Sequence, residues 1–285
     1  MGEDSKKSKL KKNEYPISPE KTRRCVLTAN SPFAAIEAYK AARTNLLFTR
    51  TGKGCQKVVL TSSFSGEGKT VNCINLGITL AQNGLRVLIM DADMRRPQIQ
   101  HIFNIKCHHG LSEVLAGLAA GADIAGEGSV IYRTEHHNLY VLPAGHTPPN
   151  PAELLASPQM EMLLKALEAK FDYIIIDSPP VSVVTDAAVL SGLVNGYILV
   201  VRQGCTPMEA LRGTVMRMEQ LKANIIGFIL NDADAGGSYK RRGYGRYGRY
   251  GKYGRYYKYG YGGGSGYGPG PYAAAAQVPD LEEKK

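Results

Sequence analysis

The segment from residue 57 to residue 81 limits the possible folds of this chain more than any other. A short apolar run at 57–61 leads into a glycine-rich turn, and a helix-like run follows from Val71 to Ala81. A strand, such a turn and a helix, in that order, form the context of a phosphate-binding loop. Gly66 and Gly68 let the backbone approach an anion, and the start of the helix points its free N–H groups toward that anion.

Residues of this turn are predicted to bind the phosphates of a nucleotide and Mg²⁺. Lys69 can reach the β- and γ-phosphates of a nucleotide, and the Thr70 hydroxyl can hold Mg²⁺. Ser63 stands where the pattern G-x-x-x-x-G-K-[ST] has its first glycine, so the loop is a variant. A glycine-rich turn with an unrelated lysine is the alternative, and the flanking strand and helix argue against it. The residues expected to bind the nucleotide here are Ser63, Phe64, Ser65, Gly66, Glu67, Gly68, Lys69, Thr70 and Val71.

Carboxylates follow two further apolar runs of the chain. The run at 86–90 ends in Asp91-Ala92-Asp93, and the run at 171–176 ends in Asp177. Ligands of open α/β sheets bind at the carboxyl ends of the strands, so these residues lie where a ligand is expected. Asp91 and Asp93 would project to the same side of an extended segment and repel one another unless a cation or a proton stood between them. A surface Asp-x-Asp in a loop is the alternative reading.

Apolar strand-like runs alternate with helix-like runs along the body of the chain. Further strands are predicted at 138–143, 196–201 and 225–230, and helices at 152–169 and 207–222. A helix is also predicted to begin at Ser31-Pro32, with the serine as its cap and the proline in its first turn. This alternation is typical of an α/β fold of the P-loop NTPase type, which is a doubly wound, mainly parallel sheet with helices on both faces.

Charge is unevenly distributed and divides the chain into three parts. The formal net charge is +10; residues 1–24 hold eight Lys or Arg against four Asp or Glu, and residues 236–272 hold eight Lys or Arg and no acid. We therefore predict a basic flexible N-terminal arm at 1–24, a P-loop domain at 25–235 and a flexible, disordered, tyrosine-rich tail at 236–285. The arm is expected to be solvated, or to be weakly attracted to an anionic membrane face.

Two absences in the sequence bear on where the chain works. No apolar run approaches the ~18 residues that cross a bilayer, and the five cysteines form no C-x-x-C pair. Scattered thiols fit a reducing cytosol better than disulfides or zinc. We therefore expect a cytoplasmic protein.

Several motifs together resemble the bacterial tyrosine kinases (BY-kinases) of capsule and exopolysaccharide synthesis. The motifs are the phosphate loop at 66–70, the run Asp91-Ala92-Asp93-Met94-Arg95-Arg96-Pro97, the run at 148–155, and Asp177-Ser178-Pro179-Pro180 with Thr185-Asp186. A cluster of C-terminal tyrosines completes the set. The resemblance covers roughly residues 25–235 and the composition of the tail, and it is to the soluble cytoplasmic type that works with a separate transmembrane activator.

The resemblance implies ATP and Mg²⁺ as cofactors and assigns roles in the site. Asp91 would accept the proton of a tyrosine hydroxyl, with Lys69 and Asp93 as the other catalytic residues. Thr70, Asp93 and Asp177 would hold Mg²⁺. By analogy with related phosphate-loop ATPases, Asn231 is expected to touch the adenine. The tail would be autophosphorylated at Tyr239, Tyr244, Tyr247, Tyr250, Tyr253, Tyr256, Tyr257, Tyr259, Tyr261, Tyr267 and Tyr272.

The resemblance also implies partners. Glu37, Lys40 and Arg43 line one side of a helix, where the family carries a Glu-x-x-Arg-x-x-Arg pattern that helps to close a ring of identical subunits. Lys40 replaces the first arginine and lacks its bidentate fork, and an ordinary Glu–Lys pair within the helix is the alternative reading. Further expected partners are a transmembrane activator of the polysaccharide co-polymerase type and a tyrosine phosphatase. The activator would bring the chain to the cytoplasmic face of the membrane, where contact with lipid would be peripheral.

Two other functions compete with a tyrosine kinase. A partition-type ATPase shares the sheet and the acidic strand ends, and lacks the tyrosine tail. A nucleic-acid-binding protein would use the interleaved Arg, Tyr and Gly of the tail for charge contacts and base stacking. The kinase is favoured because it accounts for both the body and the tail.

Overall fold

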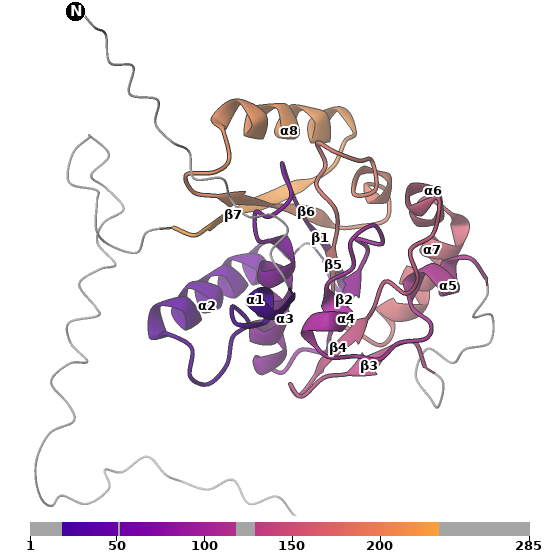
Figure 1. Cartoon of the computed structure of the whole chain (residues 1–285), viewed down its shortest axis with the longest axis horizontal. Helices are drawn as coiled ribbons and strands as arrows, with labels where there is room; N and C mark the ends of the chain where they lie inside the picture. The colour runs from indigo at the N-terminus through magenta and orange to yellow at the C-terminus, as the bar shows by residue number, and fades with distance from the viewer. Residues whose placement is uncertain (1–18, 51, 118–128, 234–285) are drawn as a thin grey trace, which may run out of the picture. The chain divides into compact units, whose positions relative to one another are not determined.

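A computed structural model describes residues 19–50, 52–117 and 129–233 of the chain. In these residues the structure has a seven-stranded sheet with the order β3-β4-β2-β5-β1-β6-β7 (Figure 1). Every neighbouring pair is parallel except β3 and β4. The strands are β1 Gln56–Ser62, β2 Val87–Asp91, β3 Tyr132–Arg133, β4 Leu139–Leu142, β5 Tyr173–Asp177, β6 Gly196–Arg202 and β7 Ile225–Asn231. The predicted α/β class with a mainly parallel sheet is confirmed.

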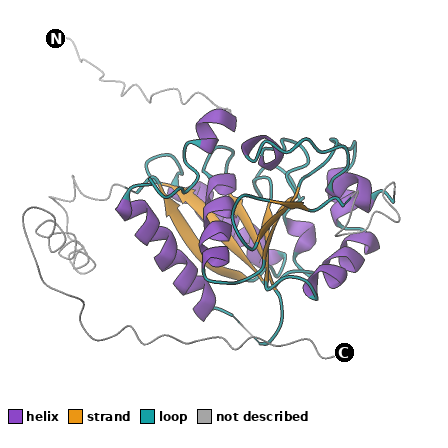
Figure 2. Ribbon diagram, turned by 90° about the horizontal axis from the view of Figure 1, so that it is seen from below, coloured by secondary structure: helices purple, strands orange, loops and turns teal. Residues whose placement is uncertain are grey.

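Helices lie on both sides of the sheet (Figure 2). The described helices are α1 Pro19–Arg23, α2 Phe33–Phe48, α3 Lys69–Gln82, α4 Ile99–Ile102, α5 Leu111–Leu115, α6 Pro151–Leu155, α7 Pro158–Glu168, the 3₁₀ helix η1 Ala188–Leu190, and α8 Met208–Gln220. None of the helices in the described residues has the length and apolar content of a membrane span.

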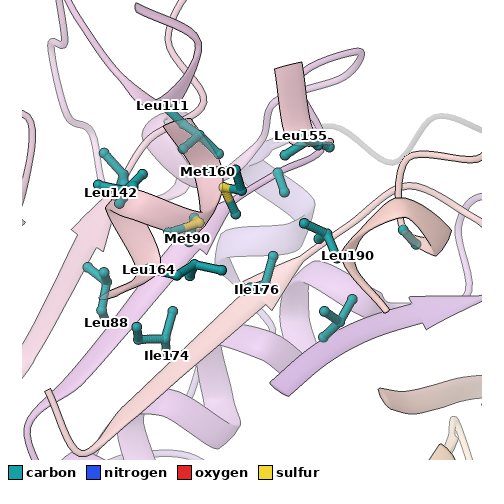
Figure 3. Close-up of a cluster of buried hydrophobic side chains, with 14 of the residues drawn as sticks. Leu88, Met90, Leu111, Leu142, Leu155, Met160, Leu164, Ile174, Ile176 and Leu190 are labelled. Carbon is teal, nitrogen blue, oxygen red and sulfur yellow. The ribbon is translucent and has the colours of Figure 1, made fainter. Parts of the chain in front are cut away.

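Strands β2 and β5 are apolar up to their terminal aspartates and are buried at every residue, because both of their faces are covered. Successive side chains of a strand point to opposite faces, and β2 and β5 divide accordingly between two buried clusters. Leu88, Met90, Ile174 and Ile176 join the cluster that α7 covers (Figure 3). Their neighbours Ile89 and Ile175 join the cluster on the other face, with the inner side of α3. Burial on both faces is typical of parallel sheets.

The structure differs from the sequence prediction at four places. The helix predicted at 152–169 is two helices, because Pro158 starts α7 and cannot continue the preceding helix. The two-residue strand β3, which pairs antiparallel to β4, was not predicted. The predicted serine cap of α2 is wrong: Pro32 occupies the cap position, and the Ser31 hydroxyl accepts a hydrogen bond from the Thr28 N–H. Helix α1 also falls within the stretch predicted to be a flexible arm.

Candidate active site

The predicted phosphate loop connects β1 to α3 and needs glycine at two positions. Gly66 and Gly68 have φ values of 82° and 95°, in the left-handed region that favours glycine. A Cβ atom on Gly68 would also lie 2.2 Å from Nδ2 of Asn231. Ser63 is not among the described residues with positive φ, so the first position of this loop accepts a side chain. The buried Ser63 hydroxyl accepts a hydrogen bond of 2.8 Å from the Thr214 hydroxyl of α8.

Side chains from three other parts of the chain hold the loop in shape. The buried Glu67 carboxylate accepts hydrogen bonds from the Phe64 N–H, at 2.9 Å, and from the Thr206 hydroxyl. The amide of Asn72, one turn into α3, donates to the Gly68 carbonyl at 2.9 Å. The amide of Asn231, at the end of β7, donates to the Glu67 carbonyl at 2.9 Å. Sequence reasoning missed Asn72 and Thr206, since neither belongs to a recognisable motif.

A cavity of about 110 Å³ lies over the loop. Of the nine nucleotide ligands predicted in the loop, six line it, while Ser63, Phe64 and Glu67 do not, and the predicted adenine contact Asn231 does not line it either. Lys69 is almost fully buried, and it begins α3, whose free N–H groups attract anions. These features suit a polyphosphate. The lining residues are Ser65, Gly66, Gly68, Lys69, Thr70 and Val71 on the loop side, with Thr22, Asp93, Arg96 and Gln98 opposite.

Two buried carboxylates end neighbouring strands beside this cavity. Asp91 of β2 is the register partner of Asp177 of β5, and the Thr70 hydroxyl donates to Asp177 Oδ2 at 2.6 Å. Burial raises the pKa of Asp91 well above its usual range, and the charge of Asp177 raises it further. Burial raises the pKa of Asp177 to about 7, although Lys69 acts in the opposite direction.

The donor atoms here fit Mg²⁺. Asp177 Oδ1 is buried and has no hydrogen-bond partner within the described part of the chain. A hard cation with oxygen ligands would satisfy this atom and relieve the repulsion between the carboxylates. Across residues 19–50, 52–117 and 129–233, no three His, Cys, Asp or Glu side chains form a ready metal cluster. Mg²⁺ commonly binds through one or two carboxylates together with phosphate oxygens and water. Asp177 and Thr70 would supply the protein oxygens of such a site, and the nucleotide and water would supply the others.

Asp91 and Asp93 occupy different places in the site. Asp91 is fully buried, and its two oxygens accept hydrogen bonds from the Asp93 N–H at 3.2 Å, the Gln98 N–H at 3.2 Å and the Ile99 N–H at 3.1 Å. It does not line the cavity, whereas Asp93 does. The structure therefore brings Asp93 and Lys69 to one cavity and keeps Asp91 behind the loop at 92–98.

A second and larger hollow lies next to the phosphate loop, between α2 and β7. Its volume is about 650 Å³, and its lining is mostly alanine and larger aliphatic side chains. Asn72 and Asn231, which hold the phosphate loop, also line this hollow, and the Tyr39 hydroxyl donates to Asn72 Oδ1 at 3.0 Å. Asn231 thus lies at the junction of the two cavities, and its amide nitrogen is engaged with the loop.

The predicted interface residues of α2 do not form one exposed set. Lys40 and Glu37 form an ion pair of 2.8 Å within the helix. The Arg43 side chain instead packs against α3, where its Nη1 donates to the Thr79 carbonyl at 3.2 Å. The eleven tail tyrosines predicted as phosphorylation sites lie outside the described residues.

Comparisons with known proteins agree with this geometry. The family model described as "AAA domain" matches residues 56–225. Tyrosine-protein kinase YwqD of Bacillus subtilis (strain 168) is 35% identical over 212 residues, which cover 74% of this chain and 86% of that protein. Tyrosine-protein kinase ptk of Acinetobacter johnsonii is 37% identical over 203 residues; the match covers 71% of this chain and only 27% of that longer protein. The kinase domain of Escherichia coli tyrosine kinase ETK superposes with a TM-score of 0.64 at 32% identity, covering 75% of this chain and 87% of that domain.

Proposed function

The chain belongs to the bacterial tyrosine-protein kinases, enzymes that transfer phosphate to protein tyrosine, and we propose that it uses ATP and Mg²⁺ to phosphorylate its own C-terminal tyrosines. One observation carries this proposal. A preformed phosphate cavity lies beside a buried carboxylate oxygen that has no hydrogen-bond partner among the described residues, in a chain whose residues 236–272 contain 11 tyrosines.

The phosphate loop and the strand ends divide the work of binding. Backbone N–H groups at the start of α3 and the Lys69 ammonium would hold the phosphates of ATP. Thr70, Asp93 and Asp177 would hold Mg²⁺, directly or through water. When bound, Mg²⁺ supplies positive charge against the phosphate oxygens. We propose that Asn231 contacts the adenine from its place beside the larger hollow, through its side-chain carbonyl or after its amide nitrogen leaves the Glu67 carbonyl.

Asp91 is proposed as the proton acceptor for the attacking tyrosine hydroxyl. Its raised pKa, which burial and Asp177 cause, makes its carboxylate a stronger base than an ordinary aspartate. Because its oxygens hold three backbone N–H groups in this structure, the loop at 92–98 has to shift before a phenol can reach it. Catalysis would otherwise consist of positioning and charge neutralisation.

The basic tyrosine-rich segment is the simplest substrate. Residues 236–272 carry eight Lys or Arg and no acid, so they would be attracted to a site that holds ATP and carboxylates. A glycine-rich chain of this length would span roughly 30–37 Å, enough to reach the site of a neighbouring subunit. Each phosphate adds about −1.5 to −2 charges, so roughly four or five would cancel the charge of the segment. We propose that phosphorylated tails leave the neighbour's site and loosen a ring-like homo-oligomer.

The wider setting is proposed from the family. The kinase would regulate the synthesis or export of capsular or extracellular polysaccharide. It would act with a transmembrane activator that recruits it from the cytoplasm to the membrane, and a tyrosine phosphatase would reverse its modification. Glu37, Lys40 and Arg43 would contribute to the ring, although Arg43 would first have to release the Thr79 carbonyl. The domain plan is proposed to be an arm at 1–24, a P-loop domain at 25–235 and a tail at 236–285.

Incubation of the purified chain with ATP and Mg²⁺, followed by mass spectrometry of the tail, tests the reaction. Phosphotyrosine is expected in the tail, and Lys69→Met should abolish it. Asp91→Asn should remove the transfer and keep nucleotide binding. ATP hydrolysis without phosphotyrosine would instead indicate a partition-type ATPase and refute the proposal.

A mixing experiment tests transfer between copies. A chain with Lys69→Met keeps its tyrosines and lacks activity, and a second chain with all eleven tail tyrosines changed to phenylalanine keeps activity and lacks the acceptors. Transfer between copies predicts that the Lys69→Met chain becomes labelled in the mixture. An unlabelled Lys69→Met chain, beside a fully labelled wild-type sample, would restrict the reaction to a single copy.

A further inference from the structure

A bidentate ion pair outside the phosphate cavity joins the two loops that follow β2 and β5. Arg95 Nε donates to Asp186 Oδ2 at 2.7 Å, and Arg95 Nη2 donates to Asp186 Oδ1 at 2.9 Å. The Asp186 side chain is completely buried, whereas 42% of the Arg95 side chain is exposed. Two parallel hydrogen bonds from a planar guanidinium set both distance and orientation. The pair therefore fixes one loop relative to the other.

Asp186 belongs to a rigid segment. The Ala188 and Val189 N–H groups donate to the Thr185 carbonyl. The Tyr197 hydroxyl of β6 donates to the Ala187 carbonyl at 2.8 Å. Leu190, a few residues on, packs into the buried cluster that also contains Ile176 of β5 (Figure 3). A carboxylate held by such a segment is a fixed anchor for whatever pairs with it.

Arg95 belongs to the loop that carries Asp93. The inner end of this loop is fixed by Asp91, whose oxygens bind the N–H groups of Asp93 and Gln98. Its middle is a tight turn, in which Asp93 Oδ1 accepts from the Arg96 N–H at 3.1 Å. Asp93 faces the phosphate cavity, while the Arg95 side chain reaches Asp186, which does not line that cavity. The ion pair is thus an attachment of this loop to the protein that lies apart from the ligand.

We propose that the Arg95–Asp186 ion pair is a positioning pair that holds the Asp93 carboxylate at the phosphate cavity for Mg²⁺. Neither residue contacts the nucleotide in this scheme. The proposal rests on the proposed function insofar as Asp93 is assigned to Mg²⁺. Residues that orient metal-binding groups from behind typically change metal affinity by about 10–100-fold when they are lost.

The two partners should respond differently in stability and alike in metal binding. Arg95→Ala leaves a buried carboxylate unpaired, which is strongly destabilising. Asp186→Ala leaves an arginine that is already partly exposed and can be solvated, so its stability cost should be smaller. If the Arg95→Ala chain does not fold, the Asp186→Ala chain, which should fold, still allows the metal-binding test.

The test measures nucleotide affinity of the full chain by calorimetry, with Mg²⁺ and again with a chelator. Arg95→Ala, Asp186→Ala and Arg95→Lys are expected to raise the Kd for Mg²⁺-nucleotide by roughly tenfold and to leave the Kd in chelator unchanged. The double variant Arg95→Ala/Asp186→Ala should lose no more than either single variant, because the two residues act through one another. Lys165→Ala, which breaks the exposed Lys165–Glu161 pair of α7, is the matched control and should change neither value.

Two further variants separate this inference from the function on which it rests. Asp93→Asn should raise the Kd only with Mg²⁺, and Lys69→Met should raise it in both conditions. If Asp93→Asn weakens Mg²⁺-nucleotide binding while Asp186→Ala binds like the wild type, the positioning role is refuted and the Mg²⁺ assignment stands. If Asp93→Asn also binds like the wild type, the Mg²⁺ assignment is refuted and the positioning role falls with it.

Discussion

The phosphate end of the sheet and its β7 edge are built in opposite ways. At or beyond the ends of β1, β2 and β5, polar side chains such as Glu67, Asp91 and Asp177 are buried, and hydrogen bonds hold most of their carboxylate oxygens. At the edge, Phe228 and Leu230 of β7 are 55% and 58% exposed. The difference indicates where a single substitution is costly. Chemistry that needs fixed distances lies at the first region, and the second should tolerate change.

The sharpest way to break the first region is Gly68→Ala. The new methyl group would meet the Asn231 amide, and the left-handed backbone would cost about 1–2 kcal/mol even without that clash. We expect nucleotide affinity to fall roughly tenfold or more, as measured by calorimetry. Gly213→Ala is the control, because a Cβ there meets nothing within 4 Å and alanine favours a helix. Wild-type affinity in Gly68→Ala would mean that the loop is not held as described.

A smaller effect is expected from Asp177→Asn, which removes a buried charge. The folded-state pKa of Asp177 is raised to about 7, whereas in the unfolded chain this carboxyl loses its proton near pH 4. Above pH 4 the folded protein therefore either keeps a proton that the unfolded chain has released or carries a buried charge. Wild-type stability without ligand therefore falls as the pH rises from about 4 to about 7. The asparagine variant lacks this loss, so its gain in Tm should be larger at pH 8 than at pH 5.

Thermal unfolding without nucleotide at the two pH values measures this gain. Each kcal/mol of relief corresponds to roughly 2–4 °C in Tm for a domain of this size. Glu161→Gln, at an exposed position of α7, should shift Tm by the same small amount at both pH values. A gain at pH 5 equal to that at pH 8 would contradict the raised pKa.

The smallest effect is expected at the β7 edge. Leu230→Ala should change the free energy of unfolding by no more than about 0.5 kcal/mol, because its side chain is largely exposed. Leu199→Ala on the neighbouring strand β6 is the matched comparison; Leu199 is buried, and its loss should cost about 2–5 kcal/mol. Urea midpoints of the two variants measure the contrast. Equal midpoints would show that the edge is as tightly packed as the interior.

The sequence was sufficient for the parts of the fold that depend on local pattern. Continuous apolar runs predicted the buried parallel strands, and the order of strand, glycine turn and helix located the phosphate loop. Very short strands and helix caps were harder to predict. The pair Tyr132–Arg133 is too short to carry a pattern, and nothing near Ser31 in the sequence indicates that its hydroxyl serves the Thr28 N–H instead of the helix.

The site could be predicted only in part, for a physical reason. Carboxylates at the carboxyl ends of parallel strands necessarily lie at the same end of the sheet. The sequence therefore predicted that Asp91 and Asp177 belong to one site, and they are register partners in the structure. The burial of Asp91 depends on how the loop at 92–98 folds back, and the contacts of Glu67 with Thr206 and of Arg95 with Asp186 join residues far apart in the chain. Contacts between residues so far apart produce no regular spacing in the sequence by which they could be predicted. The catalytic, nucleotide and metal roles stay predictions until the variants are measured.

The serine that opens the phosphate loop has a mechanical consequence. Its hydroxyl is bonded to Thr214 of α8, and its carbonyl accepts a hydrogen bond from Ser182 in the segment after β5. A glycine would offer only the second of these attachments. The loop therefore cannot move independently at its first residue: outward motion there has to move α8 as well or break a buried hydrogen bond to it, which couples the phosphate loop to the helix that follows β6 in the chain.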